Sequence, residues 1–516
     1  MTGRVARRLI PFLMLCYVLS YIGRIDVNLA WPAMSKALGL PMSSSSLGAA
    51  VGAFSLMLVL FAVPSVVLLK LIGARRWVAA SMIALGVISV GFAFTRELTL
   101  ALRATGFANI DNDRTQYILR LLLGAAVAGI LPGIVLYLAN WSTASERARY
   151  VGSFIATIPL SAALFPAVSA LLTSIIAVCD SKPDSGGWWM QLVYVCSGGV
   201  GWSGWQWMLI IAALPSIAVG IAALRYLQDS PCEAYWLNAD ERASLAARLE
   251  EDRNIRRQPL RRTIANWIVL FFCVGWLPLL LVLLLPVHWR RGLSRFARTL
   301  ILGAVLAAIS FAGASLGVPL HMNTRSAVLS LGLDHSLGLA VDKLTGYLTS
   351  VVFALAFAAA FFWSLHGGRA AGEPRHHAAL AAVVAALGLI AAASSQAPIW
   401  IALLIALGMI ASFAAMAMFW TLPAGFLAGW PAVLGISFIS SLGTMGGVLG
   451  PAFITSRGAS GGQSGLAGAL IIVACCYLFA GLMILALGRD HDRKPSLEPT
   501  PAPAVSEGSA AAPSSA

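Results

Sequence analysis

The chain has 516 residues, of which 59% are hydrophobic and only 11% are charged. A soluble domain needs about a quarter of its residues charged, so this composition excludes an ordinary water-soluble fold. The formal net charge is +14, but the basic residues lie in short clusters between apolar runs, which is how membrane topology is set. The sequence therefore predicts an all-α integral membrane protein in the lipid bilayer, with no nucleic-acid partner.

The first apolar run begins after Arg7 and Arg8 and continues as a long helix that contains Arg24 and Asp26. Its start has the features of a signal peptide, but the run is long and many spans follow, so we interpret it as an uncleaved first span. At about 1.5 Å per residue, Arg24 lies roughly 24 Å along the helix from Arg8. A charge in the outer half of the hydrocarbon layer costs on the order of 3 kcal/mol unless a partner receives it, which predicts that an anion is held there.

Twelve apolar segments in two sets of six have the length of a membrane-spanning helix. We expect them at about 9–36, 47–70, 75–95, 116–139, 150–177 and 205–227, and at about 299–326, 340–363, 376–394, 398–421, 431–455 and 466–488. The chain then divides into an N-terminal six-helix bundle (1–227), a cytoplasmic linker (228–263), a hydrophobic hairpin with a basic connector (264–298), a C-terminal six-helix bundle (299–488) and a disordered cytoplasmic tail (489–516).

Residues 264–287 are also long enough to cross the bilayer, and a single crossing would invert the second half of the chain. Basic residues flank this segment on both sides, and Gly275 and Pro278 interrupt its centre. We therefore predict an extra hairpin that enters from the cytoplasmic side before helix seven and returns; a thirteenth span is the alternative. Basic residues favour the linker side by roughly three to one, which predicts that both termini are cytoplasmic.

The seven cysteines are scattered, without metal-ligand spacing or histidine companions, so the sequence predicts no metal site and no cofactor. Cys179 and Cys196 flank one polar loop that we place outside the membrane. A disulfide can form there; two free thiols near helix ends are the alternative.

Several short motifs follow one another in order along the chain. They are YIGRID at 21–26, GARRW at 73–77, YILRLLLG at 117–124, LPG at 131–133, GWQW at 204–207, DSP at 229–231, FWTLP at 419–423 and GTMGG at 443–447. Together they resemble the anion:cation symporter family of the major facilitator superfamily, which includes bacterial permeases for phthalate, tartrate and sugar acids. The resemblance extends from Arg7 to about Arg489.

The resemblance implies a monomeric twelve-helix carrier in the bacterial inner membrane, whose two bundles rock about a central cavity to move a small organic anion. The family places one arginine on helix one and one on helix four to hold a carboxylate, and these correspond to Arg24 and Arg120. At matching depth, the two guanidinium groups are expected to form a fork-shaped receptor. Asn28 shares the face of Arg24. The alternatives are a structural ion pair for Arg24 and a snorkelling side chain for Arg120.

Two acidic residues of the family pattern are missing, and they are the expected proton-coupling groups. Gly23 replaces the acid before the helix-one arginine, and Val127 replaces the glutamate seven residues after the helix-four arginine. Asp26 stands where the family has asparagine. It is either a displaced proton site or a group that neutralises Arg24. Coupling to protons, coupling to another cation and uncoupled transport all remain open.

In the second half, His321 and Asn323 are expected to reach the outer part of the cavity. His321 is a second candidate for proton coupling; a histidine satisfied at a helix end is the alternative. Ser440 and Thr444 replace asparagines of the family and are expected to contact the polar end of the substrate, while Trp420 is expected to form a wall of the cavity.

Two functions of different class follow from these residues. The first is a secondary transporter of a small carboxylate. The second is a membrane sensor that binds such an anion without moving it, which the missing acids make credible. A membrane enzyme is not predicted, because the spans contain no nucleophile–base or metal-binding constellation.

Overall fold

The computed structural model describes residues 2–39, 44–105, 109–180, 202–256, 295–333, 336, 340–367, 374–427 and 429–487, and these residues form helices and short connections. They contain 12 helical segments that are long and apolar enough to cross a membrane. A helix satisfies its backbone N–H and C=O groups internally, which a segment in lipid requires. The chain is therefore a multi-pass membrane protein, as its composition predicts.

The membrane-spanning segments are assembled from both long and short helices. The first half contains α1 (Thr2–Leu38), α2 (Ser44–Ile72), α3 (Ala74–Ala93), α5 (Asn112–Val127), α6 (Ile130–Asn140), α7 (Ala144–Ile155), α8 (Thr157–Asp180) and α10 (Gly204–Tyr226). The second half contains α14 (Arg295–Ser315), α15 (Gly317–Ser330), α17 (Val341–Gly367), α18 (Pro374–Ser394), α19 (Pro398–Phe419), α20 (Thr421–Phe426) and α21 (Trp430–Leu487).

Four spans are broken into two consecutive helices, and a proline explains each break. The second helix of each pair contains a proline near its start, namely Pro132, Pro159, Pro319 or Pro423. A proline has no N–H to bond the carbonyl four residues earlier, and its ring clashes with that carbonyl. The preceding helices α5, α7, α14 and α19 end at that residue or one residue before it.

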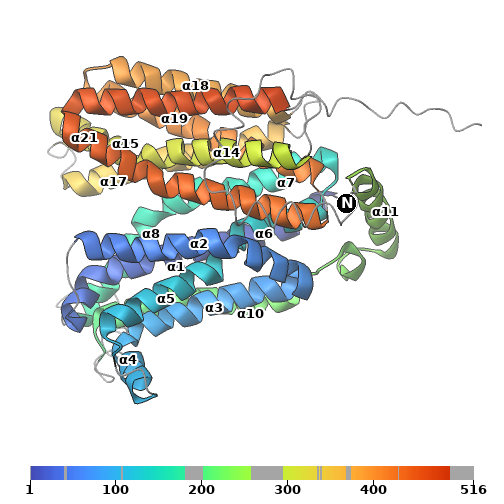
Figure 1. The fold of residues 1–516 in the computed structure, drawn as a ribbon, viewed down its shortest axis with the longest axis horizontal. Coiled ribbons are helices and arrows are strands. Elements are labelled where there is room, and N and C mark those ends of the chain that lie inside the picture. Colours follow the sequence, from blue (N-terminus) through green and yellow to red (C-terminus); the bar gives the residue numbers. More distant parts are fainter. Residues whose placement is uncertain are drawn as a thin grey trace, which may run out of the picture.

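The helices pack in two groups that follow the two halves of the chain. In the first half α3 packs along α10 and α2 along α5, and in the second half α14 packs along α21 while α18 contacts both α19 and α21. Figure 1 shows most of the blue-to-green helices below the yellow-to-red ones, with α7 lying up beside the second group. Contacts of α2 with α21 and of α8 with α17 join the groups. This is the predicted arrangement of two six-helix bundles.

The two bundles also meet at one end of the molecule, where α7 packs against α17, α19 and α20. Gly152 of α7 makes the closest approach, since a Cβ atom added there would lie 2.5 Å from the Cβ of Ser364 on α17. By contrast, α1 and α15 make their main contacts within their own halves. Among the described helices, α7 therefore adds a further contact between the bundles to those of α2 with α21 and of α8 with α17.

The segment after α10 docks onto the same end of the first bundle, next to the N-terminus in Figure 1. It contains η1 (Pro231–Glu233) and α11 (Ala239–Arg256). The Asp229 carboxylate accepts a hydrogen bond of 2.8 Å from the backbone N–H of Arg75 in the first turn of α3. The hydroxyl of Tyr137 donates to the backbone carbonyl of Gln228, 2.8 Å away. These bonds fix the start of the linker to the first bundle.

The structure differs from the expected elements at two places. A short helix, α4 (Thr95–Ala104), lies in the stretch expected to be a loop after the third span. The last two spans both lie within α21, which folds back on itself. A Cβ atom added to Gly465 would lie 2.3 Å from the carbonyl oxygen of Arg457, whereas eight residues of straight helix would separate the two by about 12 Å.

Three predictions concern residues outside the described part of the chain. They are the hydrophobic hairpin at 264–287, the disordered tail at 489–516, and the disulfide between Cys179 and Cys196, because the structure describes neither Cys196 nor the side chain of Cys179. All three stay predictions.

Candidate functional site

Arg24 lies two thirds of the way along α1 and is half-buried. Its Nη2 donates a hydrogen bond to Ser20 Oγ at 3.2 Å, one turn earlier on the same helix. Its guanidinium carbon lies 5.9 Å from the centre of the Tyr17 ring. The Nε atom is buried and has no hydrogen-bond partner among the described residues. Arg24 therefore does not form the alternative structural ion pair with any described neighbour.

Arg120 lies on α5 and is only 3% exposed, so it does not snorkel to the surface. Its Nη1 donates to Oδ1 of Asn28 on α1 over 3.0 Å, and its guanidinium carbon lies 5.5 Å from the centre of the Trp31 ring. Both Nε and Nη2 are buried and have no partner in the described structure. A buried, incompletely bonded guanidinium is an unusual and costly arrangement, which an anion would relieve.

Arg24 of α1 and Arg120 of α5 bond to α1 at two different positions along its length. Arg24 bonds to Ser20 and Arg120 bonds to Asn28, and these partners are separated by about 12 Å along the helix axis. The expected fork, with both guanidinium groups at one depth, is therefore not the arrangement in this conformation. The site instead offers two separate cationic groups, which together present three unpartnered buried nitrogen atoms.

Asp26 does not neutralise Arg24 through an ion pair, because the two residues lie on opposite faces of α1. It is fully buried, with Oδ1 accepting a hydrogen bond from the backbone N–H of Val27 at 2.6 Å. The charged group that interacts with it is Arg120, although the two do not come within ion-pair distance. One buried acid therefore lies near the two arginines, on the other side of α1, without an ion pair to either.

The residues expected from the second half are more scattered. His321 on α15 is exposed. The Asn323 side chain donates to the backbone carbonyl of Pro319 on its own helix at 2.8 Å, and Thr444 donates to the carbonyl of Ser440 on α21 at 3.0 Å. The Ser440 side chain is buried. None of these residues has a contact in the described structure that joins it to the arginines.

Trp420 does not form a cavity wall in this conformation. Its side chain is fully buried at the junction of α19 and α20, where it packs edge-on against Phe419 with ring centres 6.0 Å apart. The reason is the break before Pro423, which turns this part of the chain into the core near the contact between the bundles. The expectation for Trp420 as a wall residue is therefore wrong for this conformation.

Sequence reasoning missed the two aromatic residues that flank the arginines. Tyr17 and Trp31 each face one guanidinium group, and a guanidinium stacks well on an aromatic ring. The signal was present, since Tyr17 and Trp31 are separated from Arg24 by seven residues on either side and so lie near its face of the helix. Within the described residues, no cluster of three or more His, Cys, Asp or Glu side chains could hold a metal ion.

Comparisons with known proteins agree with this architecture. Residues 13–331 match the sequence profile of the Major Facilitator Superfamily. A protein named as a tartrate transporter in Agrobacterium vitis is 29% identical over 487 residues, which is 94% of this chain and 94% of that protein. The metabolite transport protein NicT of Pseudomonas putida is 34% identical over 250 residues, 48% of this chain and 49% of that protein.

Solved structures show the same fold. The proton:xylose symporter XylE superposes with a TM-score of 0.58 at 14% identity, covering 94% of this chain and 96% of that chain. The human organic anion transporter MFSD10 superposes with a TM-score of 0.54 at 14% identity, covering 93% of this chain and 99% of that chain. At such low identity the likeness concerns the fold alone.

Proposed function

Because this chain belongs to the major facilitator superfamily, we propose that it is a secondary transporter that moves a small organic anion across the membrane by alternating access. Arg24 and Arg120 bind the anionic groups of that solute. The protein acts as a monomer in a bacterial inner membrane, with both termini in the cytoplasm.

One observation supports this proposal above the others. Arg24 and Arg120 are retained within the membrane-spanning part of the first bundle, and three of their buried nitrogen atoms have no hydrogen-bond partner in the described structure. Leaving a buried donor unbonded costs about 1–3 kcal/mol, and more for a charged group. A carboxylate accepts hydrogen bonds from guanidinium groups with favourable geometry. An anionic substrate would therefore satisfy donors that the protein itself leaves unsatisfied.

The spacing of the arginines favours an anion with a second polar end. One carboxylate cannot bridge two guanidinium groups whose partners lie about 12 Å apart along α1 unless a side chain swings. A solute such as tartrate, which has two carboxylates, can approach both cations more easily. The name of the Agrobacterium vitis relative is consistent with this class.

Polar side chains of the second bundle supply the opposite wall of the proposed site. His321 is exposed on α15, and α15 makes its main contacts within its own bundle. Binding sites in such carriers lie between the two halves, near the midplane. We assign His321, Asn323, Ser440 and Thr444 to the wall that closes over the anion when the bundles rock.

Uptake into proteoliposomes tests the proposal. Labelled tartrate, galacturonate and phthalate would be presented at two pH values, with empty liposomes as the blank. We expect saturable uptake of at least one of these acids, and its loss in Arg24→Ala. Arg96→Ala, at the exposed start of α4, is the matched control and should transport normally.

Two results would count against the proposal. Thermal stabilisation of the purified protein by one of the acids, without any flux, would favour the sensor. Uptake at the wild-type rate in Arg24→Ala would remove this arginine from the site.

A further inference from the structure

Asp26 is a buried acid that the proposed anion site does not use. Its side chain is fully buried, and its Oδ2 has no hydrogen-bond partner among the described residues. Its Oδ1 is occupied by the adjacent Val27 N–H. A buried ionised carboxylate with an unbonded oxygen is strongly unfavourable, whereas the protonated form removes the charge. The local structure therefore favours a bound proton.

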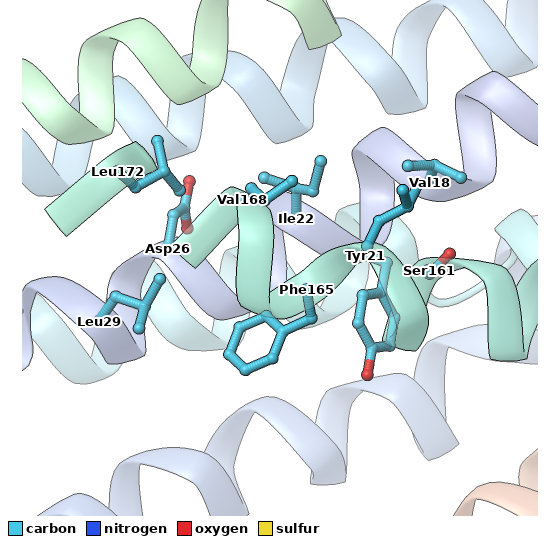
Figure 2. A pocket seen from close by; sticks show the side chains of 10 residues that line it. Val18, Tyr21, Ile22, Asp26, Leu29, Ser161, Phe165, Val168 and Leu172 are labelled. Carbon is cyan, nitrogen blue, oxygen red and sulfur yellow. The ribbon is translucent and has the colours of Figure 1, made fainter. Parts of the chain in front are cut away.

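The carboxyl group faces a narrow cavity of about 10 Å³ between α1 and α8, which has room for about one water molecule. Figure 2 shows Asp26 beside Val168 and Leu172 of α8, while the two other polar lining groups, Tyr21 and Ser161, lie at the opposite end. A hard metal cation takes six or more oxygen ligands. The surroundings of Asp26 are apolar, so the cation that fits this carboxyl group is a proton.

Few other groups can change the charge of this cavity. Arg120 on α5 is the charged residue that interacts with Asp26, and Tyr21 lines the cavity from α1 itself. The residues of α8 that line it are not titratable. On the neighbouring helix α3, no residue after Arg76 is titratable. On α10, no residue before Arg225 is titratable.

Asp26 and the anion site lie on opposite sides of one helix. Asp26 is two residues from both Arg24 and Asn28, which corresponds to a rotation of about 200° around α1. The charge of Asp26 nevertheless acts on Arg120, which is bonded to Asn28. An ionised Asp26 therefore weakens the attraction of Arg120 for an anion, and protonation removes this competition.

We propose that Asp26, in the apolar cavity between α1 and α8, is the proton-binding site through which this carrier couples anion movement to protons. The proposal rests on the proposed function for its coupling partner. A proton bound at Asp26 raises the affinity of Arg120 for an anion. A bound anion raises the affinity of Asp26 for a proton by the same factor, because linkage between two sites is reciprocal. The proton and the anion therefore cross the membrane in the same direction. Asp26, at a different position on α1, takes the role of the acids that the family resemblance implies at positions 23 and 127.

The first test does not require a known substrate. Infrared difference spectra of the purified protein between acidic and alkaline buffer would show the C=O stretch of a protonated carboxyl group. We expect one band in the wild type that is lost in Asp26→Asn and kept in Glu97→Gln, an exposed acid on α4. A spectrum that is the same in wild type and Asp26→Asn would overturn the assignment of the proton site.

The second test measures coupling with the acid that proves to be transported among tartrate, galacturonate and phthalate. An inward proton gradient should drive accumulation in the wild type and in Glu97→Gln. In Asp26→Asn we expect loss of this accumulation, while exchange of labelled for unlabelled acid across the membrane continues. Gradient-driven accumulation in Asp26→Asn would overturn the coupling role.

The two tests separate this inference from the proposed function. If no acid of the panel is transported by the wild type, the carboxylate assignment fails, and the infrared band still decides whether Asp26 binds a proton. Asp26→Glu serves as a second variant if Asp26→Asn does not fold. It should keep a titratable band, shifted in frequency because the longer side chain reaches a different part of the cavity.

Discussion

The Nη1 atom of Arg120 on α5 donates a hydrogen bond to Oδ1 of Asn28 on α1, over 3.0 Å. This bond holds the second arginine against the helix that contains the first, and it does so with a neutral amide. An amide orients the guanidinium group without cancelling its charge. The remaining Nε and Nη2 atoms are buried and have no hydrogen-bond partner in the described structure.

Replacement of Arg120 by lysine should impair transport although the charge is kept. Lysine has a compact ammonium group and lacks the planar fork that bonds Asn28 and a carboxylate together. The loss of one hydrogen bond to a charged group, worth about 1.5–3 kcal/mol, corresponds to about a 10- to 100-fold loss of affinity. The concentration dependence of uptake in proteoliposomes measures it as a raised KM.

Arg114→Lys is the control for this substitution, because Arg114 is exposed near the start of the same helix. It should transport like the wild type. An unchanged KM in Arg120→Lys would mean that substrate binding does not depend on the planar geometry of the guanidinium group.

Asn28→Asp should make the protein more stable and a poorer transporter. The new carboxylate would face Arg120 at the present hydrogen-bond distance and form an ion pair with it. This pair would satisfy a buried cation, so the thermal unfolding temperature should rise, and it would compete with the substrate, so KM should rise by about 10-fold or more. Differential scanning fluorimetry and uptake assays measure the two effects. Asn28→Ala should raise KM without raising the unfolding temperature, and a fall in stability in Asn28→Asp would contradict the site.

The sequence was sufficient for the fold and for the elements that contain the site. Apolar length and basic clusters indicated twelve spans in two sets, and the structure confirms them. Arg24 could be identified because a charged side chain inside a membrane span has a high free-energy cost. Each of these features is local to the chain, so a periodic pattern or a single misplaced charge is enough to reveal it.

The arrangement of the site was harder to predict. Arginine has a long side chain whose direction depends on its neighbours, so depth along the helix could not tell that Arg24 turns towards Ser20 and Arg120 towards Asn28. The prediction that Trp420 forms a wall of the cavity does not hold in this conformation for a similar reason. Its exposure depends on the break before Pro423 and on the packing of α20 against the other bundle, which are tertiary facts.

A disulfide across the contact between the bundles should stop transport reversibly. A Cβ atom at position 152 on α7 would lie 2.5 Å from the Cβ of Ser364 on α17, so the two helices must separate slightly, to the Cβ–Cβ distance of about 3.5–4.5 Å that a disulfide needs, for cysteines at both positions to cross-link. Oxidation of the Gly152→Cys, Ser364→Cys double variant should abolish uptake, and a reducing agent should restore it, because alternating access requires this end to open. Each single variant under the same oxidant is the control. Full uptake by the cross-linked protein would show that the α7–α17 contact does not separate during transport.

The family resemblance implies an acid at the position of Gly23, and the structure gives a steric reason why this chain has none there. A Cβ atom added at Gly23 would lie 2.9 Å from Cδ1 of Leu85 on α3, so the two helices leave no room for a side chain unless Leu85 moves. Alanine requires a small shift of a flexible side chain, and glutamate requires a large one together with burial of its carboxyl group. We therefore expect Gly23→Ala to lower the unfolding temperature slightly and Gly23→Glu to lower it strongly.

Removal of the obstacle should reverse part of this loss. In the Gly23→Glu, Leu85→Ala double variant the space vacated by the leucine side chain receives the glutamate, so the stability should exceed that of Gly23→Glu alone even though Leu85→Ala by itself removes a fully buried side chain. A double-mutant cycle of unfolding temperatures measures the coupling. Strictly additive effects would show that the contact with Leu85 is not what excludes an acid from position 23, and the absence of that acid would then need a functional explanation.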